Sequence, residues 1–248
     1  MSGHSKWSTI KRKKGTNDAK RGKIFTKLIR ELTVSARSGG DENSNPNLRT
    51  AVQNAKAANM PQATIDRAIR RGIGDEPGAV YEHSMYEGYG PGGVAIMVET
   101  LTDNKNRTVA EVRHVFTKYN GSLGESGAVS WMFDQKGVIE VAKSDIDEED
   151  LMIAVMDAGA EDIQDGDDVH EVLSAVASFE AVKQALEESD IACSQAHLAW
   201  LPQNTLEVEG DEAEKIVRLL EAMEDLDDVQ KVYSNFDIQE EELQKLMA

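Results

Sequence analysis

The sequence predicts a multi-domain protein with an N-terminal three-helix domain followed by two α/β domains of ferredoxin-like (split βαβ) character. Three observations support this α and α+β architecture. The 248 residues exceed one average domain. Apolar residues recur with helical spacing up to about residue 77, and strand-like and helix-like patterns alternate beyond it. The charge is also divided: residues 1–74 hold 16 Lys and Arg against 5 Asp and Glu, net +11, whereas the remainder is net −29.

The first 16 residues predict a flexible basic arm. The segment GHSKWSTIKRKKG has only Trp7 and Ile10 as large apolar residues, too few to form a core. No apolar stretch follows its charges, so it does not resemble a secretory signal. No apolar run approaches the roughly 18 residues of a membrane span, and a single cysteine excludes an internal disulfide framework. We therefore expect a cytoplasmic protein that does not enter a membrane and needs no cofactor.

Residues 17–77 predict an all-α basic domain; together with the arm we call residues 1–77 the head. A first helix runs to about Arg37, capped by Thr16 or Asn17 and ended by a left-handed turn at Gly39–Gly40. A second helix follows Ser44 or Asn45 as cap and ends near residue 59. A third begins at Pro61 and stops at Gly72. Apolar residues line one side of each helix, which favours a small bundle.

The rest of the chain predicts two nested α+β domains. Strands at 80–87, 94–100 and 129–133 and a helix at 105–119 precede a strand at 205–209, a helix at 211–223 and a strand at 229–234. We expect these pieces, 78–133 plus 204–237, to form one discontinuous domain. Residues 134–203 read as β-α-β-β-α-β, the split βαβ order, and would be inserted into it. Residues 238–248 form an acidic tail.

The glycines of YEGYGPGG satisfy the spacing G-x-G-x-x-G without its context. A dinucleotide site needs a helix to open at the last glycine, but here the strand VAIMVET follows. A tight turn is the better interpretation, and a backbone surface that contacts RNA or protein is its functional alternative. This candidate interaction surface is Gly88, Tyr89, Gly90, Pro91, Gly92 and Gly93.

No catalytic or metal-binding constellation is recognisable in the sequence. The five histidines lack ligand spacing such as H-E-x-x-H, and Ser126 in GESG does not complete a nucleophile elbow. The acidic runs at 145–150, 161–171, 221–228 and 240–242 are typical of a solubilising surface. Alternatively, they would turn the acidic part of the chain away from a polyanion, or toward a cationic protein partner.

Basic residues of the head are the candidate binding residues. Any one of them could simply be a solvated helix face, and cations at a helix C-terminus are also favoured by the helix dipole. Their density favours a polyanion, because phosphates would neutralise charges that otherwise repel one another, and Trp7 could stack on an exposed base. The candidates are His4, Lys6, Trp7, Lys11, Arg12, Lys13, Lys14, Lys20, Arg21, Lys23, Lys27, Arg30, Arg67, Arg70 and Arg71.

Four segments closely resemble the YebC/PmpR family, which includes a mitochondrial translational activator of cytochrome c oxidase. They are GHSKWSTIKRKKGTNDAKRGKIFTKLIREL, NPNLRTAVQNAKAANMP, YEGYGPGGVAIMVE and DNKNRTVAEVRHVF. The resemblance implies three domains and a bacterial cytoplasmic protein described as a DNA-binding transcriptional regulator. It also implies a second reading, because some relatives act in translation on ribosomes, including ribosomes slowed at proline-rich stretches. The resemblance carries over to the arm, to the first-helix residues Lys20, Arg21, Lys23 and Lys27, and to the turn at 88–93.

We therefore expect a non-enzymatic, nucleic-acid-binding regulator of gene expression, with DNA as the first candidate target. The alternative is a ribosome-associated translation factor that binds rRNA, since a Lys-rich arm carrying Trp7 suits irregular RNA. An enzyme that uses a cleft of the α/β part is the least favoured hypothesis. The sequence does not indicate the oligomeric state.

Overall fold

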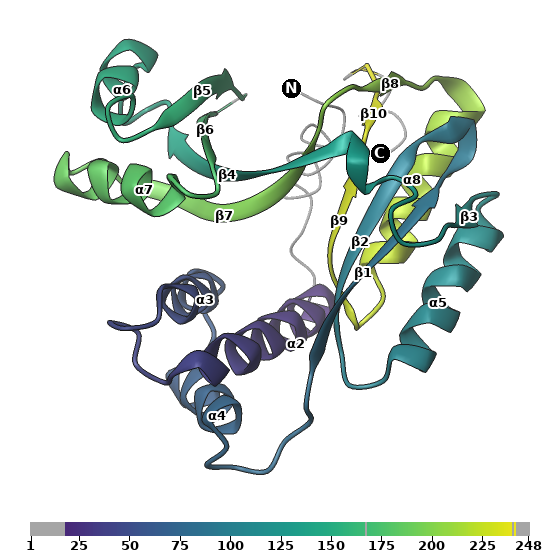
Figure 1. Cartoon of the computed structure of the whole chain (residues 1–248), viewed down its shortest axis with the longest axis horizontal. Helices are drawn as coiled ribbons and strands as arrows, with labels where there is room; N and C mark the ends of the chain where they lie inside the picture. The colour runs from purple at the N-terminus through teal and green to yellow at the C-terminus, as the bar shows by residue number, and fades with distance from the viewer. Residues whose placement is uncertain (1–17, 167, 240, 242–248) are drawn as a thin grey trace. The chain divides into compact units, whose positions relative to one another are not determined.

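The computed structural model describes residues 18–166, 168–239 and 241. The described chain divides into two compact units, one of residues 133–203 and one of the residues on either side of it in the sequence. Figure 1 shows helical and mixed α+β parts, and the predicted fold class is confirmed. The arm at 1–16 and most of the tail at 238–248 lie outside the described residues.

The head consists of helices α2 (Asp18–Ser35), α3 (Pro46–Ala57) and α4 (Gln62–Ile73) with a short 3₁₀ turn, η1 (Ala36–Ser38). These helices enclose a core of their own, in which the side chains of Leu32, Leu48, Val52 and Ile65 are fully buried. The apolar stripe of each helix is therefore used inside the head.

One helix end in the head lies where the sequence predicts it, and another does not. Asn45 caps α3 as expected, because its side chain accepts a hydrogen bond from the Leu48 amide. The left-handed stop of α4 is Gly74 (φ 89°), whereas Gly72, the predicted stop, lies inside the helix. A Cβ at Gly72 would lie 2.5 Å from Cβ of Ala36 and from the Thr33 carbonyl oxygen. Gly72 therefore permits the close approach of α4 to α2.

The outer α+β part, residues 78–132 and 204–239, is called the body. Its sheet has the order β3-β1-β2-β9 with every neighbouring pair antiparallel, and helices α5 and α8 cover one face (Figure 1). A short parallel pair, β8 with β10, lies beside it. The bounds are β1 (Glu82–Tyr89), β2 (Ala95–Thr102), α5 (Lys105–Lys118), β3 (Ser122–Leu123), β8 (Leu206–Glu207), α8 (Gly210–Glu224), β9 (Val229–Ser234) and β10 (Phe236–Asp237).

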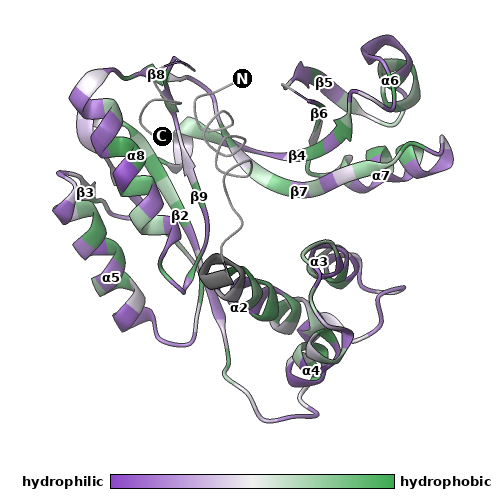
Figure 2. Cartoon of the chain, turned by 180° about the vertical axis from the view of Figure 1, so that it is seen from behind, coloured by the Kyte–Doolittle hydropathy of each residue, from purple (hydrophilic) through white to green (hydrophobic). Residues whose placement is uncertain are grey.

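The body core lies between the sheet and its two helices. Its fully buried side chains include Val98, Phe116, Ile216, Leu220 and Phe236. Both helices carry apolar and polar stretches along their length, as amphipathic helices on a sheet do (Figure 2). This core and the core of the head are separate clusters.

Residues 133–203 form the inserted unit. Its antiparallel sheet has the order β5-β6-β4-β7. The connection order β-α-β-β-α-β on this sheet is the split βαβ arrangement that the sequence predicts. The bounds are β4 (Phe133–Ala142), α6 (Glu148–Val155), β5 (Ala160–Asp165), β6 (Val169–Ala175), α7 (Phe179–Glu188) and β7 (Cys193–Pro202).

The predicted strand at 129–133 is wrong. Residues 130–132 form a 3₁₀ turn, and the strand begins only at Phe133. The reason is the buried carboxylate of Glu87, which accepts hydrogen bonds from the amides of Gly127, Val129 and Ser130, each at 2.8 Å. Amides turned toward one carboxylate are not available to a neighbouring strand.

Candidate nucleic-acid interface

The structure describes only part of the predicted basic site. The candidates in the arm, from His4 to Lys14, lie outside the described residues. The backbone at Lys20 and Arg21 belongs to α2, and the side chains described from this helix begin at residue 22. The candidate binding residues whose side chains the structure describes are Lys23, Lys27 and Arg30 of α2 and Arg67, Arg70 and Arg71 of α4.

The last turns of α4 present cations to solvent. Arg67, Arg70 and Arg71 are all exposed. Arg70 is paired with Glu76, Nε to Oε1 2.8 Å, and this hydrogen bond holds the pKa of the Glu76 carboxyl below its usual range. Arg67 and Arg71 are four residues apart, so they share one side of the helix. Among the described residues neither forms an ion pair, although the charges of both contribute to lowering the pKa of Glu76.

The cations of α2 are placed differently. Lys23, Lys27 and Arg30 follow one another at helical spacing and contact the segment at the end of α8. Lys23 Nζ lies 3.2 Å from the carbonyl oxygen of Asp225 and 3.2 Å from its Oδ1. Lys27 Nζ donates to the carbonyl of Glu224 at 2.9 Å. These three candidate binding residues are therefore turned toward the body.

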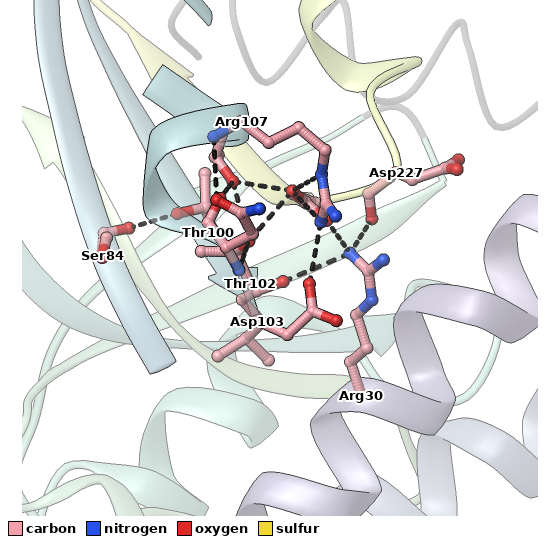
Figure 3. A network of polar contacts seen from close by, with 11 residues as sticks. Arg30, Ser84, Thr100, Thr102, Asp103, Arg107 and Asp227 are labelled. Carbon is pink, nitrogen blue, oxygen red and sulfur yellow. Dashed lines mark hydrogen bonds and ion pairs between the residues drawn. The ribbon is translucent and has the colours of Figure 1, made fainter. Parts of the chain in front are cut away.

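Arg30 enters a polar network around the carboxylate of Asp228 (Figure 3). The guanidinium donates to Asp228 Oδ1 at 2.8 Å, to the Leu101 carbonyl at 3.2 Å and to the Asp227 carbonyl. It also lies over the ring of Tyr81, 5.3 Å from the centroid. With its side chain only 11% exposed, Arg30 connects head to body and offers little surface to a ligand.

Residues of the body complete the coordination of Asp228. Arg107 on α5 donates from Nη2 at 2.8 Å, and Thr102 and Thr108 donate at 3.0 and 2.7 Å. Burial alone would raise the pKa of Asp228, but these hydrogen bonds and the charge of Arg30 outweigh it, so the pKa is lowered. Asp228 therefore remains a carboxylate although its side chain is 2% exposed.

A second polar cluster lies on the sheet face opposite α5 and α8. Glu99 on β2 accepts from Tyr233 at 3.0 Å and pairs with His83, Nε2 to Oε1 3.0 Å. Lys231 stands opposite Glu99 in the strand register. Glu31 of α2 faces these residues, and burial raises its pKa while the charge of Lys231 opposes that rise. Sequence reasoning did not find this cluster, because β2 and β9 each contribute a single charged residue, Glu99 and Lys231, and no pattern along one strand marks it.

The glycine-rich segment is a tight hairpin turn. Strands β1 and β2 pair antiparallel up to Tyr89 and Ala95, with the 3₁₀ turn η2 (Pro91–Gly93) between them. This confirms the turn, and its role as an interaction surface stays a prediction. The loop held by Glu87 lies beside it: the Ala128 carbonyl of that loop accepts hydrogen bonds from the Tyr89 hydroxyl, at 2.9 Å, and from the Trp131 indole, at 3.2 Å. Trp131 is 68% exposed.

The described residues contain no group of three or more His, Cys, Asp or Glu side chains that could hold a metal ion. Among them, no helix has the length and apolarity needed to cross a bilayer.

Two family models match consecutive parts of the chain. Residues 5–75 match the model described as the TACO1/YebC protein N-terminal domain, and residues 81–236 match that of the TACO1/YebC second and third domain. The chain belongs to the TACO1/YebC family. The resemblance noted in the sequence is thereby confirmed. The family models also divide the chain between residues 75 and 81, directly after α4.

Full-length relatives of the TACO1/YebC family support the same assignment. A protein of Citrifermentans bemidjiense is 54% identical over 248 residues, covering 100% of both chains. One of Desulforapulum autotrophicum is 56% identical, covering 97% of this chain and 98% of its own. Both bear the name "Probable transcriptional regulatory protein". The crystal structure of a conserved hypothetical protein from Aquifex aeolicus is similar with a TM-score of 0.83 and 47% identity, over 90% of this chain and 92% of that one.

Proposed function

We propose that this member of the TACO1/YebC family is a non-enzymatic regulator of gene expression whose head binds nucleic acid. The observation that carries the proposal is the pair Arg67 and Arg71, exposed on one side of α4, within residues 1–74, whose net charge is +11. Guanidinium groups in solvent bind phosphates with charge-assisted hydrogen bonds, and this binding does not depend on base sequence. The basic arm would add phosphate contacts and a stacking side chain, Trp7.

DNA is the first candidate target. Relatives that are 54% and 56% identical to this chain bear the name "Probable transcriptional regulatory protein". The head would bind the phosphates of the DNA. The inserted unit and the body are acidic, so the polyanion would repel them. Repulsion of that kind favours one orientation on the nucleic acid.

RNA is the second candidate, favoured by the composition of the arm. Lys6, Lys11 and Lys14 surround a single tryptophan in a segment with too few apolar residues for a core. Such a segment suits unpaired bases and irregular RNA surfaces, whereas a uniform duplex groove offers no exposed base for Trp7. A translation factor that acts on the ribosome would use the arm in this way.

Crosslinking in living cells separates the two targets. The protein is expressed from its own promoter with an affinity tag at the C-terminus and is crosslinked to nucleic acid in the cell. It is then purified under denaturing conditions, and the bound DNA and RNA are both sequenced. Enrichment at a limited set of promoters supports the transcriptional role, and enrichment of rRNA positions supports the translational one. The control is a variant that lacks residues 1–16 and carries Arg67→Gln and Arg71→Gln. If the wild type recovers no more DNA or RNA than this variant, nucleic-acid binding by the head is contradicted.

A further inference from the structure

The end of α8 lacks the cations that usually stabilise a helix C-terminus. Its last turn contains no basic residue, and acids crowd the segment from Glu221 to Asp228. Acidic side chains are unfavourable there, because the free carbonyl groups already give that end a partial negative charge. The amino groups of Lys23 and Lys27 supply the missing positive charge from the head, since they bind the carbonyls of Asp225 and Glu224.

Polar and ionic contacts connect the head to the body, together with the ring of Tyr81 beneath Arg30. The two apolar cores are separate clusters, so no shared apolar cluster joins α2 to the sheet. The contacts are instead those of Lys23, Lys27 and Arg30, with Glu31 near Lys231. Ionic contacts weaken as salt or a competing anion is added, whereas apolar burial does not. The attachment of α2 to the body is thus sensitive to a polyanion.

The three cations are not held equally. Lys23 and Asp225 form a solvent-exposed pair, with side chains 44% and 68% exposed, and such pairs are weak. Arg30 is largely buried, Asp228 is fully enclosed, and their side chains share hydrogen bonds with five other residues. A phosphate could therefore displace the α8 end from the lysines well before it displaced Asp228 from Arg30.

We propose that Lys23 and Lys27 form a latch with two alternative partners: the C-terminal end of α8 in the free protein, and phosphate groups when nucleic acid is bound. Arg30 stays on Asp228 in both states and acts as the anchor of the head. Nucleic acid then releases the start of α2 from the body, and the α8 end reduces the affinity of the head for nucleic acid. This inference rests on the proposed function and adds to it a regulation of the same site.

Carbodiimide crosslinking tests the latch directly, because it joins an amine and a carboxylate that are in contact. Lys23 Nζ and Asp225 Oδ1, 3.2 Å apart, should yield a crosslink that mass spectrometry detects in the full chain. Lys136 and Glu161 of the inserted unit, 2.6 Å apart, provide a matched internal control. The probe is a 30-base-pair duplex of mixed sequence without terminal phosphates, at a concentration that saturates binding by fluorescence anisotropy.

Saturating duplex should lower the Lys23–Asp225 yield by about threefold or more and leave the control yield unchanged. Asp225→Asn should tighten duplex binding by about two- to fivefold beyond the effect of Asp211→Asn, which removes an exposed charge at the other end of α8. The latch is overturned if the duplex binds without changing the Lys23–Asp225 crosslink yield, or if Asp225→Asn and Asp211→Asn change duplex affinity equally. Either result leaves the proposed function standing. Absence of any duplex or RNA binding overturns both.

Discussion

Arg30 and Asp228 lie 198 residues apart in the sequence, and their side chains meet at 2.8 Å between Nη1 and Oδ1. The contact joins the first described helix of the head to the residue that precedes β9. Both side chains are buried, at 11% and 2% exposure, so the pair depends on its hydrogen bonds to offset the loss of hydration. It fixes where the cations of the head stand relative to the body sheet.

Asp228→Asn should lower the free energy of unfolding by about 3 kcal/mol, because two guanidinium groups would lose a buried carboxylate. Urea denaturation at neutral pH measures this loss. Asp227→Asn is the matched control, since Asp227 is exposed and contacts Arg30 through its backbone carbonyl. Equal, small effects of the two substitutions would show that the network is peripheral to stability.

Two glycines of the head should respond to alanine in opposite directions. Gly72→Ala places a Cβ 2.5 Å from the Thr33 carbonyl oxygen, so α4 must move away from α2 at a loss of about 1–3 kcal/mol. Gly22→Ala meets no atom within 4 Å in the helix interior and should stabilise by about 0.5–1 kcal/mol. Thermal melts of both variants check the signs; destabilisation by Gly22→Ala would contradict the placement of residue 22 in α2.

The sequence predicted the local features of the head and the inserted unit well. The Asn45 cap depends on residues three positions apart, and the split βαβ order follows from alternating strand and helix patterns. Contacts between distant segments were not predictable in this way. The partners of Glu87 are amides 40 to 43 residues away, so a strand was expected where a loop is held by its carboxylate.

The candidate site shows the same limit. Helical spacing places Lys23, Lys27 and Arg30 on one side of α2, and the sequence predicts that they bind a polyanion. For the run at 221–228 it predicts a solubilising surface or a surface for a cationic protein partner, whereas the backbone and carboxylates of this run bind these three side chains of the same chain. Because only folding determines which segments meet, the sequence alone could not separate the cations that bind the body from the exposed Arg67 and Arg71.

The Glu87 carboxylate should be needed for the order of the loop at 127–130. Burial alone would raise its pKa, but the hydrogen bonds from Gly127, Val129 and Ser130 outweigh burial and lower it. Glu87→Gln should speed amide hydrogen exchange at these positions and shift the emission of Trp131. Glu125→Gln, an exposed acid of the same loop, should do neither, and similar exchange in both variants would exclude this role.

His83 should make stability depend on pH near neutrality. Its hydrogen bond to Glu99 raises its pKa in the folded state above the value of about 6.5 expected in the unfolded chain. The stabilisation is therefore complete below about pH 6.5 and is lost as pH rises through the raised folded-state pKa. The melting temperature of the wild type should fall more between pH 6 and pH 9 than that of His83→Gln. His114→Gln, at an exposed position of α5, should behave as the wild type.

The salt dependence of nucleic-acid affinity tests the central claim, that the head binds phosphates. Anisotropy titrations of a labelled 30-base-pair duplex and of a 30-nucleotide RNA between 50 and 200 mM salt give the slope of log K against log salt. Arg67→Gln with Arg71→Gln should reduce the magnitude of the duplex slope by about 2, roughly one for each lost phosphate contact. Arg113→Gln with Lys215→Gln, at exposed positions of body helices, should leave it unchanged. Equal slopes for the wild type and both double variants would contradict the claim.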